Sequence, residues 1–313
     1  MAIAMKLLFI ADPLDSFKLE KDTTLAMMRV AQSAGHEIWY TQSHDLLWGQ
    51  GKARARAQPL TVTNDLIWYR LGEVEEHSLD YFTAVLMRQD PPFTVEYLTS
   101  TWILSAAVLQ GARVFNNPDA VRNHSEKLSI TEFPQFIPPT LVTRDIHAIR
   151  DFHGLHHDIV IKPLDGMGVF RVGSDGLNLG SIVETLGENG SRTLMAQRFL
   201  PEITAGDKRV LLIGGEVMPY ALARIPQGTE IRGNLAVGGK GLAMALTARE
   251  EEIANHLAPI LAKRGLFLVG LDMIGGYLTE INVTSPTCFV EIAQQTDCDV
   301  AKKWLTRLEK ELA

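Results

Sequence analysis

Short apolar runs alternate with amphipathic helical patterns through residues 6–116. The first run, residues 6–10, ends just before Asp12 and Pro13, as a strand buried in a parallel sheet does. Residues 23–34 then place apolar side chains at helical spacing and stop at Gly35. Alternating strands and helices predict a doubly wound sheet that binds ligands near the carboxyl ends of its strands. The further elements of this alternation are strands at residues 36–40, 84–87 and 113–116 and a long helix at residues 94–110.

The pattern changes after residue 123. Pro134, Pro138 and Pro139 form a connector that cannot continue a helix. Beyond it, apolar runs joined by glycine turns predict hairpins rather than strand–helix–strand units. The predicted elements are strands at 158–163, 169–172, 194–200, 209–213, 269–273 and 278–283, with Gly-Gly turns at 214–215 and 275–276 and a helix at 249–265.

Composition narrows the classes of function. Of the 313 residues, 46% are hydrophobic and 21% charged, which is typical of a folded globular protein. Lys and Arg total 30 against 37 for Asp and Glu, a net charge of −7, so we expect no nucleic-acid partner. Cys288 and Cys298 form no disulfide or zinc pattern, and no run reaches the length of a membrane span. These features predict a cytoplasmic protein with no membrane partner.

The strongest chemical signal is a carboxylate hairpin late in the chain. Two strands joined by Gly275-Gly276 bring Asp272 opposite Glu280 or Asn282. Two carboxylates and an amide oxygen on one patch suit Mg²⁺, especially where phosphate oxygens complete the coordination. A solvated acidic face is the alternative. The apolar neighbours of Asp272 and Glu280 favour burial, and a buried carboxylate needs a partner or a metal.

A second signal is a set of cations at strand ends and turns. Most isolated Lys and Arg residues are surface charges. Lys162 differs because it ends the apolar run at 159–161, and Arg224 similarly follows residues 220–223. Cations placed in this way hold phosphates or a substrate carboxylate. The full set is Lys127, Lys162, Lys208, Arg209, Arg224 and Arg232.

Glycine-rich turns are the third signal. Gly166 and Gly168 lie in a predicted hairpin turn, and residues 228–241 form a longer glycine-rich segment. Such turns let backbone N–H groups approach an anion, and they also form mobile lids. An ordinary flexible loop is the alternative for either stretch. Neither segment is a Walker A loop or a GxGxxG motif.

Taken in order, these motifs resemble those of the ATP-grasp ligases, and specifically the bacterial glutathione synthetase family. The carboxylate hairpin alone indicates only an ATP-grasp protein. The narrower resemblance depends on Asp-Pro-Pro-Phe at 90–93, Arg-Ile-Pro-Gln-Gly at 224–228 and Asn-Val-Thr-Ser-Pro-Thr at 282–287. Further matching segments are residues 21–24, 26–27, 86–90, 123–127, 161–168, 206–210, 223, 232–236, 270–272 and 280–281, so the resemblance spans nearly the whole chain.

This resemblance implies an α/β and α+β architecture in three parts. A doubly wound N-terminal domain would cover residues 1–123, a central ATP-grasp lid subdomain residues 124–200, and a C-terminal ATP-grasp subdomain residues 201–313. ATP would lie between the two α+β lobes.

It also implies roles for individual residues. Lys127 and Lys162 would contact the ATP phosphates, under the turn of Gly166 and Gly168. Gln197, Arg198, Phe199 and Leu200 would line the adenine edge, and Asp207 would face the ribose. Asp272, Glu280 and Asn282 would hold Mg²⁺ or Mn²⁺. Arg209, Arg224, Arg232 and Asn234 would serve the reacting carboxylate, the acyl phosphate or the peptide.

In the family reaction, the cysteinyl carboxylate of γ-glutamylcysteine attacks the γ-phosphate of ATP, and glycine then takes the acyl group to give glutathione, ADP and phosphate. The resemblance further implies a homo-oligomer, a dimer or a tetramer. Phosphoryl transfer depends mainly on positioning and charge neutralisation, which the predicted cations and metal ligands supply.

The chain departs from the family pattern at Gln89, where a lysine is common in the family, and in one turn. Val169 follows Gly168 directly, so the glycine-rich hairpin is about three residues shorter than is usual in the family. In ATP-grasp proteins that hairpin covers the phosphates, so the short turn leaves the first of two alternatives open. One is a nucleotide-binding protein that has lost turnover, and the other is an ATP-grasp ligase acting on a different peptide.

Overall fold

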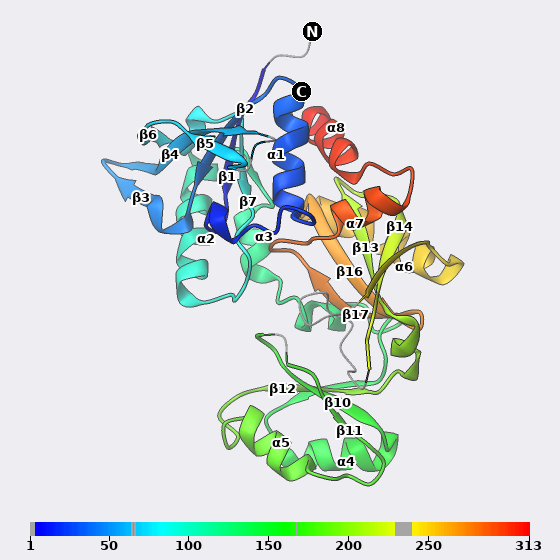
Figure 1. Cartoon of the computed structure of the whole chain (residues 1–313). Coiled ribbons are helices and arrows are strands. Elements are labelled where there is room, and N and C mark those ends of the chain that lie inside the picture. The colour runs from blue at the N-terminus through cyan, green and yellow to red at the C-terminus, as the bar shows by residue number, and fades with distance from the viewer. Residues whose placement is uncertain (1–3, 64, 66, 167, 229–239) are drawn as a thin grey trace.

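The computed structural model describes residues 4–63, 65, 67–166, 168–228 and 240–313, and it contains three β-sheets (Figure 1). The sheets follow one another along the chain, over residues 6–115, 140–198 and 207–282. The predicted combination of an α/β layer followed by α+β lobes is confirmed. The exact domain boundaries stay a prediction.

The first sheet contains the predicted parallel layer. Its parallel strands are β1 (Lys6–Ile10), β2 (Glu37–Thr41), β7 (Ala84–Met87) and β8 (Val114–Phe115). β1 lies between β2 and β7, so Leu7, Leu8 and Phe9 are completely buried. The helices of this part are α1 (Thr23–Ser33), α2 (Val95–Leu109) and α3 (Pro118–Asn123).

An antiparallel extension of this sheet was not predicted. It comprises β3 (Leu46–Gly49), β4 (Lys52–Val62), β5 (Tyr69–Leu71) and β6 (Glu75–Ser78), all paired with β4. Along β4, Ala53, Ala55 and Ala57 are buried and alternate with Arg54 and Arg56. Alanine is a weak strand former, so a search for β-branched apolar runs misses this strand.

The second sheet is antiparallel, in the order β11-β10-β12-β9, and forms a separate lobe. Its strands are β9 (Thr140–Thr143), β10 (Ile159–Pro163), β11 (Phe170–Val172) and β12 (Leu194–Arg198). Helices α4 (Ile146–His156) and α5 (Leu179–Leu186) cover the face turned away from the rest of the molecule (Figure 1). Ile149, Ile159, Ile161 and Val183 give this lobe a core of its own.

The third sheet is also antiparallel, in the order β15-β14-β13-β16-β17. Its strands are β13 (Asp207–Ile213), β14 (Glu216–Ile225), β15 (Lys240–Ala245), β16 (Leu268–Ile274) and β17 (Tyr277–Asn282). The hairpins predicted at 214–215 and 275–276 are confirmed. Helix α6 (Ala248–Lys263) packs on β13 and β14, and α7 (Phe289–Gln295) leads to α8 (Val300–Leu312).

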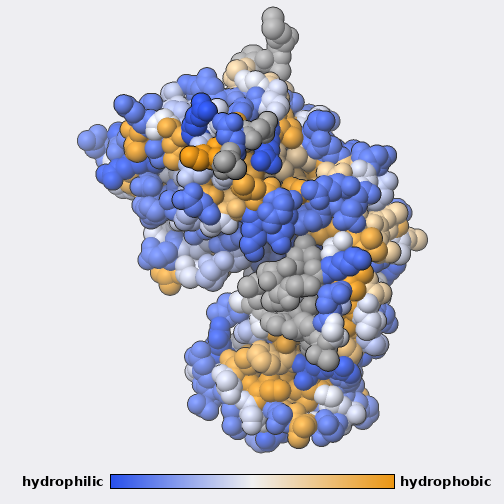
Figure 2. Space-filling model, viewed as in Figure 1, coloured by the Kyte–Doolittle hydropathy of each residue, from blue (hydrophilic) through white to orange (hydrophobic). Residues whose placement is uncertain are grey.

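The end of the chain returns to the first sheet. Helix α8 packs on α1, and the two lie side by side in red and blue in Figure 1. The Trp304 ring lies 6.3 Å from the ring of Phe9, so one hydrophobic cluster joins the two parts. Among the described residues, no helix has the length and apolarity needed to span a membrane. Figure 2 shows a mainly hydrophilic N-terminal part in this view and a hydrophobic area on the lobe of α4 and α5.

Candidate active site

A cleft of about 880 Å³ lies where the three sheets meet. Its walls come from the ends of the first-sheet strands, from β10 and β12 of the small lobe, and from β13, β14, β16 and β17. The predicted site residues that line it are Lys127, Lys162, Gly166, Gln197, Arg198, Phe199, Leu200, Asp207, Arg209, Arg224, Asp272, Glu280 and Asn282. Gly168 is not among the lining residues, and Arg232 and Asn234 lie outside the described residues.

The carboxylate hairpin forms one wall of the cleft. In the β16–β17 register Asp272 pairs with Glu280, and Gly270 pairs with Asn282. Asp272 is only 3% exposed and Glu280 is half-buried, so the acidic patch is not a solvated surface face. Glu126 holds the backbone that follows: its Oε1 atom accepts hydrogen bonds from the N–H groups of Val283 and Thr284 at 3.0 and 3.2 Å.

Two arginines bind the Asp272 carboxylate. Arg209 donates from Nε and Nη2 to the two oxygens, both at 2.8 Å, because β13 and β16 place Arg209 and Asp272 opposite each other. Arg224 Nη2 lies 2.9 Å from the same Oδ2 atom. Burial raises the pKa of Asp272, but the two guanidinium groups outweigh this effect and hold the pKa well below its usual range.

Asp207 completes this network. Its Oδ2 atom lies 2.5 Å from Arg224 Nη2, and its Oδ1 atom is buried without a hydrogen-bond partner among the described residues. Burial raises the pKa of Asp207 to about 6, against the opposite effect of Arg224. An unsatisfied buried carboxylate oxygen is unusual in folded proteins and is compatible with a ligand hydroxyl at this point.

Two lysines line the cleft, Lys127 beside Glu280 of the hairpin and Lys162 on β10 of the small lobe. Lys127 donates from Nζ to the Gly166 carbonyl at 2.7 Å and lies 3.7 Å from Glu280 Oε1. Lys162 is 6% exposed, and it has no ion-pair partner within the described ranges. Burial lowers the pKa of Lys162. Lys208, another candidate cation, instead pairs with Glu250 of α6 at 2.8 Å and does not line the cleft.

The predicted adenine edge lies at the end of β12. Gln197 is buried and donates from Nε2 to Thr140 Oγ1 at 3.0 Å. Arg198 donates to the Tyr277 hydroxyl at 3.3 Å, which links the small lobe to β17. The Phe199 ring lies under the guanidinium of Arg171, 3.8 Å from its centroid. The site therefore has an apolar and aromatic end beside its charged centre.

Sequence reasoning missed several charged residues that line this cleft, and two of them come from elements next to the site. Arg88 follows strand β7 directly and is 5% exposed, and Glu291 projects from α7. Arg88 had a signal of the same kind as Lys162, since it ends the apolar run at residues 84–87. Glu291 had none, because only the packing of α7 brings it to the cleft.

Comparison with known proteins identifies the relationship. The model of the prokaryotic glutathione synthetase N-terminal domain matches residues 5–122, and that of the prokaryotic glutathione synthetase ATP-grasp domain matches residues 126–297. The chain belongs to the prokaryotic glutathione synthetase family. Members named glutathione synthetase include one from Ralstonia nicotianae, 55% identical over 98% of this chain and 96% of its own length, and one from Nitrosomonas europaea, 53% identical over 99% of each chain.

Solved structures outside this close group share the fold. D-cycloserine synthetase DcsG superposes with a TM-score of 0.70 at 15% identity, covering 98% of this chain and 100% of that one. The ATP-grasp ligase PsnB, complexed with a precursor variant, Mg and ADP, gives 0.63 at 16% identity, covering 100% of both chains. The glutathione synthetase family fold is thus an ATP-grasp fold.

Proposed function

We propose that this protein is an ATP-dependent ligase that joins γ-glutamylcysteine to glycine, giving glutathione, ADP and phosphate. The observation that carries the proposal is the cleft itself, where two lysines face a carboxylate hairpin that two arginines flank. Identity above 50% to relatives named glutathione synthetase favours this function over a nucleotide-binding protein without turnover and over a ligase for another peptide.

The cations supply the first chemical step. Lys127 and Lys162 are placed to bind phosphate oxygens of ATP, since Lys162 is buried and has no described ion-pair partner. The cysteinyl carboxylate then attacks the γ-phosphorus, the bond to the bridging oxygen breaks, and ADP leaves. Arg209 and Arg224 stabilise the charge on the attacking carboxylate and on the acyl phosphate.

The second step needs a site closed to water. The glycine amine attacks the acyl carbon, the amine loses a proton, and phosphate leaves. An acyl phosphate hydrolyses when water reaches it, so the glycine-rich segment at 227–241, most of which lies outside the described residues, has a physical reason to exist as a lid. In this proposal Arg232 and Asn234, both in that segment, serve the acyl phosphate or the peptide.

The donor set fits a magnesium ion. Asp272 and Glu280 pair across the hairpin, and Asn282 adds an amide oxygen, which are the hard ligands that Mg²⁺ prefers. Within the described ranges no group of three His, Cys, Asp or Glu residues has metal-site geometry. The proposed donor set has only two carboxylates, so phosphate oxygens would have to complete the coordination of the ion. Bound there, Mg²⁺ or Mn²⁺ would neutralise phosphate charge.

We further propose a cytoplasmic homo-oligomer, a dimer or a tetramer. The outer face of α2 supports self-association, because Val95, Trp102 and Leu109 repeat every seven residues and are 72%, 53% and 90% exposed. Sedimentation of the wild type and of the Trp102→Glu variant tests self-association through α2. An oligomeric wild type that dissociates in the variant supports this surface as the interface. A monomeric wild type contradicts the proposal.

The central experiment measures phosphate release from ATP and Mg²⁺ with γ-glutamylcysteine, with and without glycine. We expect glycine-dependent release and a product with the mass of glutathione. Glu280→Gln should abolish it while leaving the thermal unfolding temperature nearly unchanged, because Glu280 is half-buried and its nearest cation is 3.7 Å away. Full activity in Glu280→Gln would contradict the metal assignment.

A further inference from the structure

Glu126 lines the cleft but takes no part in the chemical steps above. It lies in the connector between α3 and β9, residues 124–139, directly before Lys127. Its Oε1 atom accepts three hydrogen bonds, from the N–H groups of Val283 and Thr284 at 3.0 and 3.2 Å and from the Thr284 hydroxyl at 2.9 Å. All three donors belong to the segment that directly follows β17, so one carboxylate oxygen fixes the end of the carboxylate hairpin.

The backbone of the connector holds the same hairpin along its edge. Strand β17 is the outermost strand of the third sheet, so its outer N–H groups need partners from outside the sheet. The Ile281 N–H donates to the Glu126 carbonyl and the Leu278 N–H to the Phe136 carbonyl, both at 2.8 Å. Glu126 therefore binds the residue before Asn282 with its carbonyl and the residue after it with its carboxylate.

Asn282 is held without the use of its amide oxygen. Its Nδ2 atom donates to the Gly270 carbonyl at 3.3 Å, and its Oδ1 atom accepts no hydrogen bond from a described residue. The amide oxygen is the atom that a cation would bind, and the residue lines the cleft. Glu126 thus fixes the position of this oxygen through the backbone on either side of it.

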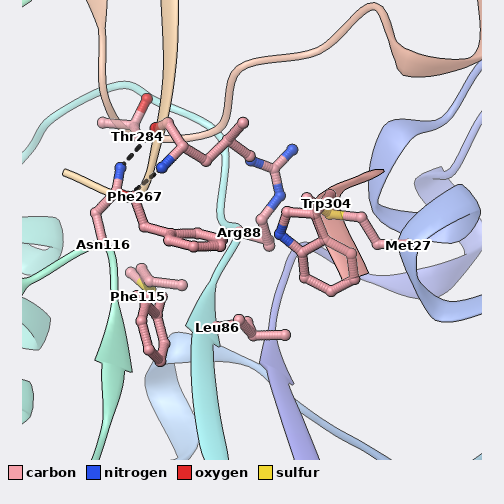
Figure 3. Close-up of a pocket in the computed structure, with 10 residues that line it drawn as sticks. Met27, Leu86, Arg88, Phe115, Asn116, Phe267, Thr284 and Trp304 are labelled. Carbon is pink, nitrogen blue, oxygen red and sulfur yellow. Dashed lines mark hydrogen bonds between the residues drawn. The ribbon is translucent and has the colours of Figure 1, made fainter. Parts of the chain in front are cut away.

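Asn116 holds the segment after β17 from the first sheet. It directly follows β8, and its Nδ2 atom donates to the Val283 carbonyl at 2.8 Å. It also exchanges two hydrogen bonds of 2.8 Å with the backbone of Leu268 (Figure 3). Val283 is completely buried and Thr284 nearly so, so the loss of Glu126 would leave two buried N–H groups without partners.

Glu126 also sets the position of Lys127. Consecutive Cα atoms are about 3.8 Å apart, so a shift of Glu126 moves Lys127 with it. The Lys127 ammonium lies 2.7 Å from the Gly166 carbonyl of the small lobe and 3.7 Å from Glu280 Oε1 of the hairpin. The lysine and the cation donors therefore share one anchor.

We propose that Glu126 is a positioning residue that keeps Lys127 in register with Glu280 and Asn282, so that the cation and the nucleotide phosphates are bound together. The inference rests on the proposed function, because it concerns the metal–nucleotide complex of that reaction. Glu126 acts through its neighbours. Its Oε1 atom already accepts three hydrogen bonds, which leaves this atom no free lone pair for a cation.

Mn²⁺ binding in the presence of ADP tests the proposal without turnover. Glu126→Ala removes all three hydrogen bonds, so Kd for Mn²⁺, measured by water-proton relaxation, should rise about 10- to 100-fold, as for the loss of a charged acceptor. We expect kcat to fall by a similar factor and KM for γ-glutamylcysteine to change by less than about threefold. An unchanged Kd for Mn²⁺ would overturn the proposal.

Glu126→Gln separates position from charge. Glutamine keeps an oxygen acceptor for the same three donors, so Kd for Mn²⁺ and kcat should both stay within about fivefold of the wild type. A loss as large as that in Glu126→Ala would show that the negative charge itself acts on the cation, as in a direct ligand, and would contradict the positioning role.

Glu132→Ala is the matched control. Glu132 lies on the same connector and pairs with Arg264 at 2.6 Å, but it does not line the cleft. Its loss should leave both Kd for Mn²⁺ and kcat unchanged, because it makes no contact with the hairpin. Losses equal to those of Glu126→Ala would assign the effect to a loosened connector and overturn the role of Glu126.

The outcomes separate the two proposals. A wild type that binds Mn²⁺ and ADP without glycine-dependent turnover would contradict the proposed function, and the Mn²⁺ series would still decide the role of Glu126. An active wild type whose Glu126→Ala variant binds Mn²⁺ normally would contradict the positioning role alone.

A second pair of variants decides the question if Glu126→Ala fails to fold. Thr284→Val removes one of the three hydrogen bonds and should raise Kd for Mn²⁺ about threefold, whereas Thr284→Ser keeps the hydroxyl and should not. Equal Kd values for these two variants would overturn the proposal.

Discussion

The two charged walls of the cleft are built in opposite ways. On the five-stranded sheet, Arg209 and Arg224 are paired with Asp207 and Asp272 at 2.5–2.9 Å, so two positive charges meet two negative ones. On the small lobe, Lys162 is just as buried but has no ion-pair partner in the described part of the chain. The two arginines and two aspartates of the first wall balance one another, whereas Lys162 makes no ion pair with a described residue.

This difference separates two uses of buried charge. A balanced network is rigid and stabilises the fold, but removing one member leaves the others buried and unpaired. An unpaired lysine destabilises the fold through desolvation and recovers that energy when an anion binds. The first wall is therefore suited to positioning groups, and the second to binding phosphate.

The largest effect is expected from removing the ion pairs that Asp272 makes with two arginines. Asp272→Asn removes the anion between Arg209 and Arg224, so it should lower the free energy of unfolding by about 3 kcal/mol. It should also reduce glycine-dependent phosphate release by more than about 100-fold. Urea unfolding and the coupled phosphate assay measure the two effects.

The matched control is Asp65→Asn, which removes a carboxylate whose ion pair with Arg70 is exposed. It should change the free energy of unfolding by less than about 1 kcal/mol. If Asp272→Asn is no more destabilising than this control, the Asp272 pairs are not a stabilising network.

A smaller effect is expected from replacing Lys162, the lysine of the small lobe without an ion-pair partner among the described residues. Lys162→Met should raise KM for ATP by about 10- to 100-fold, because a charged contact to phosphate is lost. Its free energy of unfolding should stay the same or increase, since no ion pair is broken and the desolvation cost disappears. Initial rates at varied ATP concentration and urea unfolding test the two parts.

Lys208→Met is the control for that prediction. Lys208 pairs with the buried Glu250 at 2.8 Å, so its loss should destabilise the fold without changing ATP binding. Similar results for both lysines would show that the distinction between paired and unpaired cations does not hold.

The smallest effect concerns the short turn over the lysine wall. Inserting Gly-Ala-Ser after Gly168 lengthens the loop between β10 and β11, which costs only about 0.3 kcal/mol in loop entropy. The additional backbone N–H groups should lower KM for ATP about threefold, as expected for one further weak hydrogen bond. An unchanged or higher KM would show that the short turn already covers the phosphates fully.

Local patterns were sufficient for much of the fold. The apolar run at residues 6–10 matches β1, and the Gly-Gly turns at 214–215 and 275–276 join the strands they were expected to join. These elements are set by side-chain spacing and turn chemistry within a few residues. Strand β4 was missed because its buried face is alanine, whose preference for strands is low.

The sequence by itself determined the family resemblance, the hairpin that pairs Asp272 with Glu280, and the strand-end position of Lys162, because each depends on neighbours along the chain. Only the tertiary structure decided which charges are compensated. Arg209 meets Asp272 through the register of β13 and β16, and Glu291 reaches the cleft because α7 packs on α1. Ion pairing depends on distances of a few ångströms between segments remote in sequence, and no local pattern contains those distances.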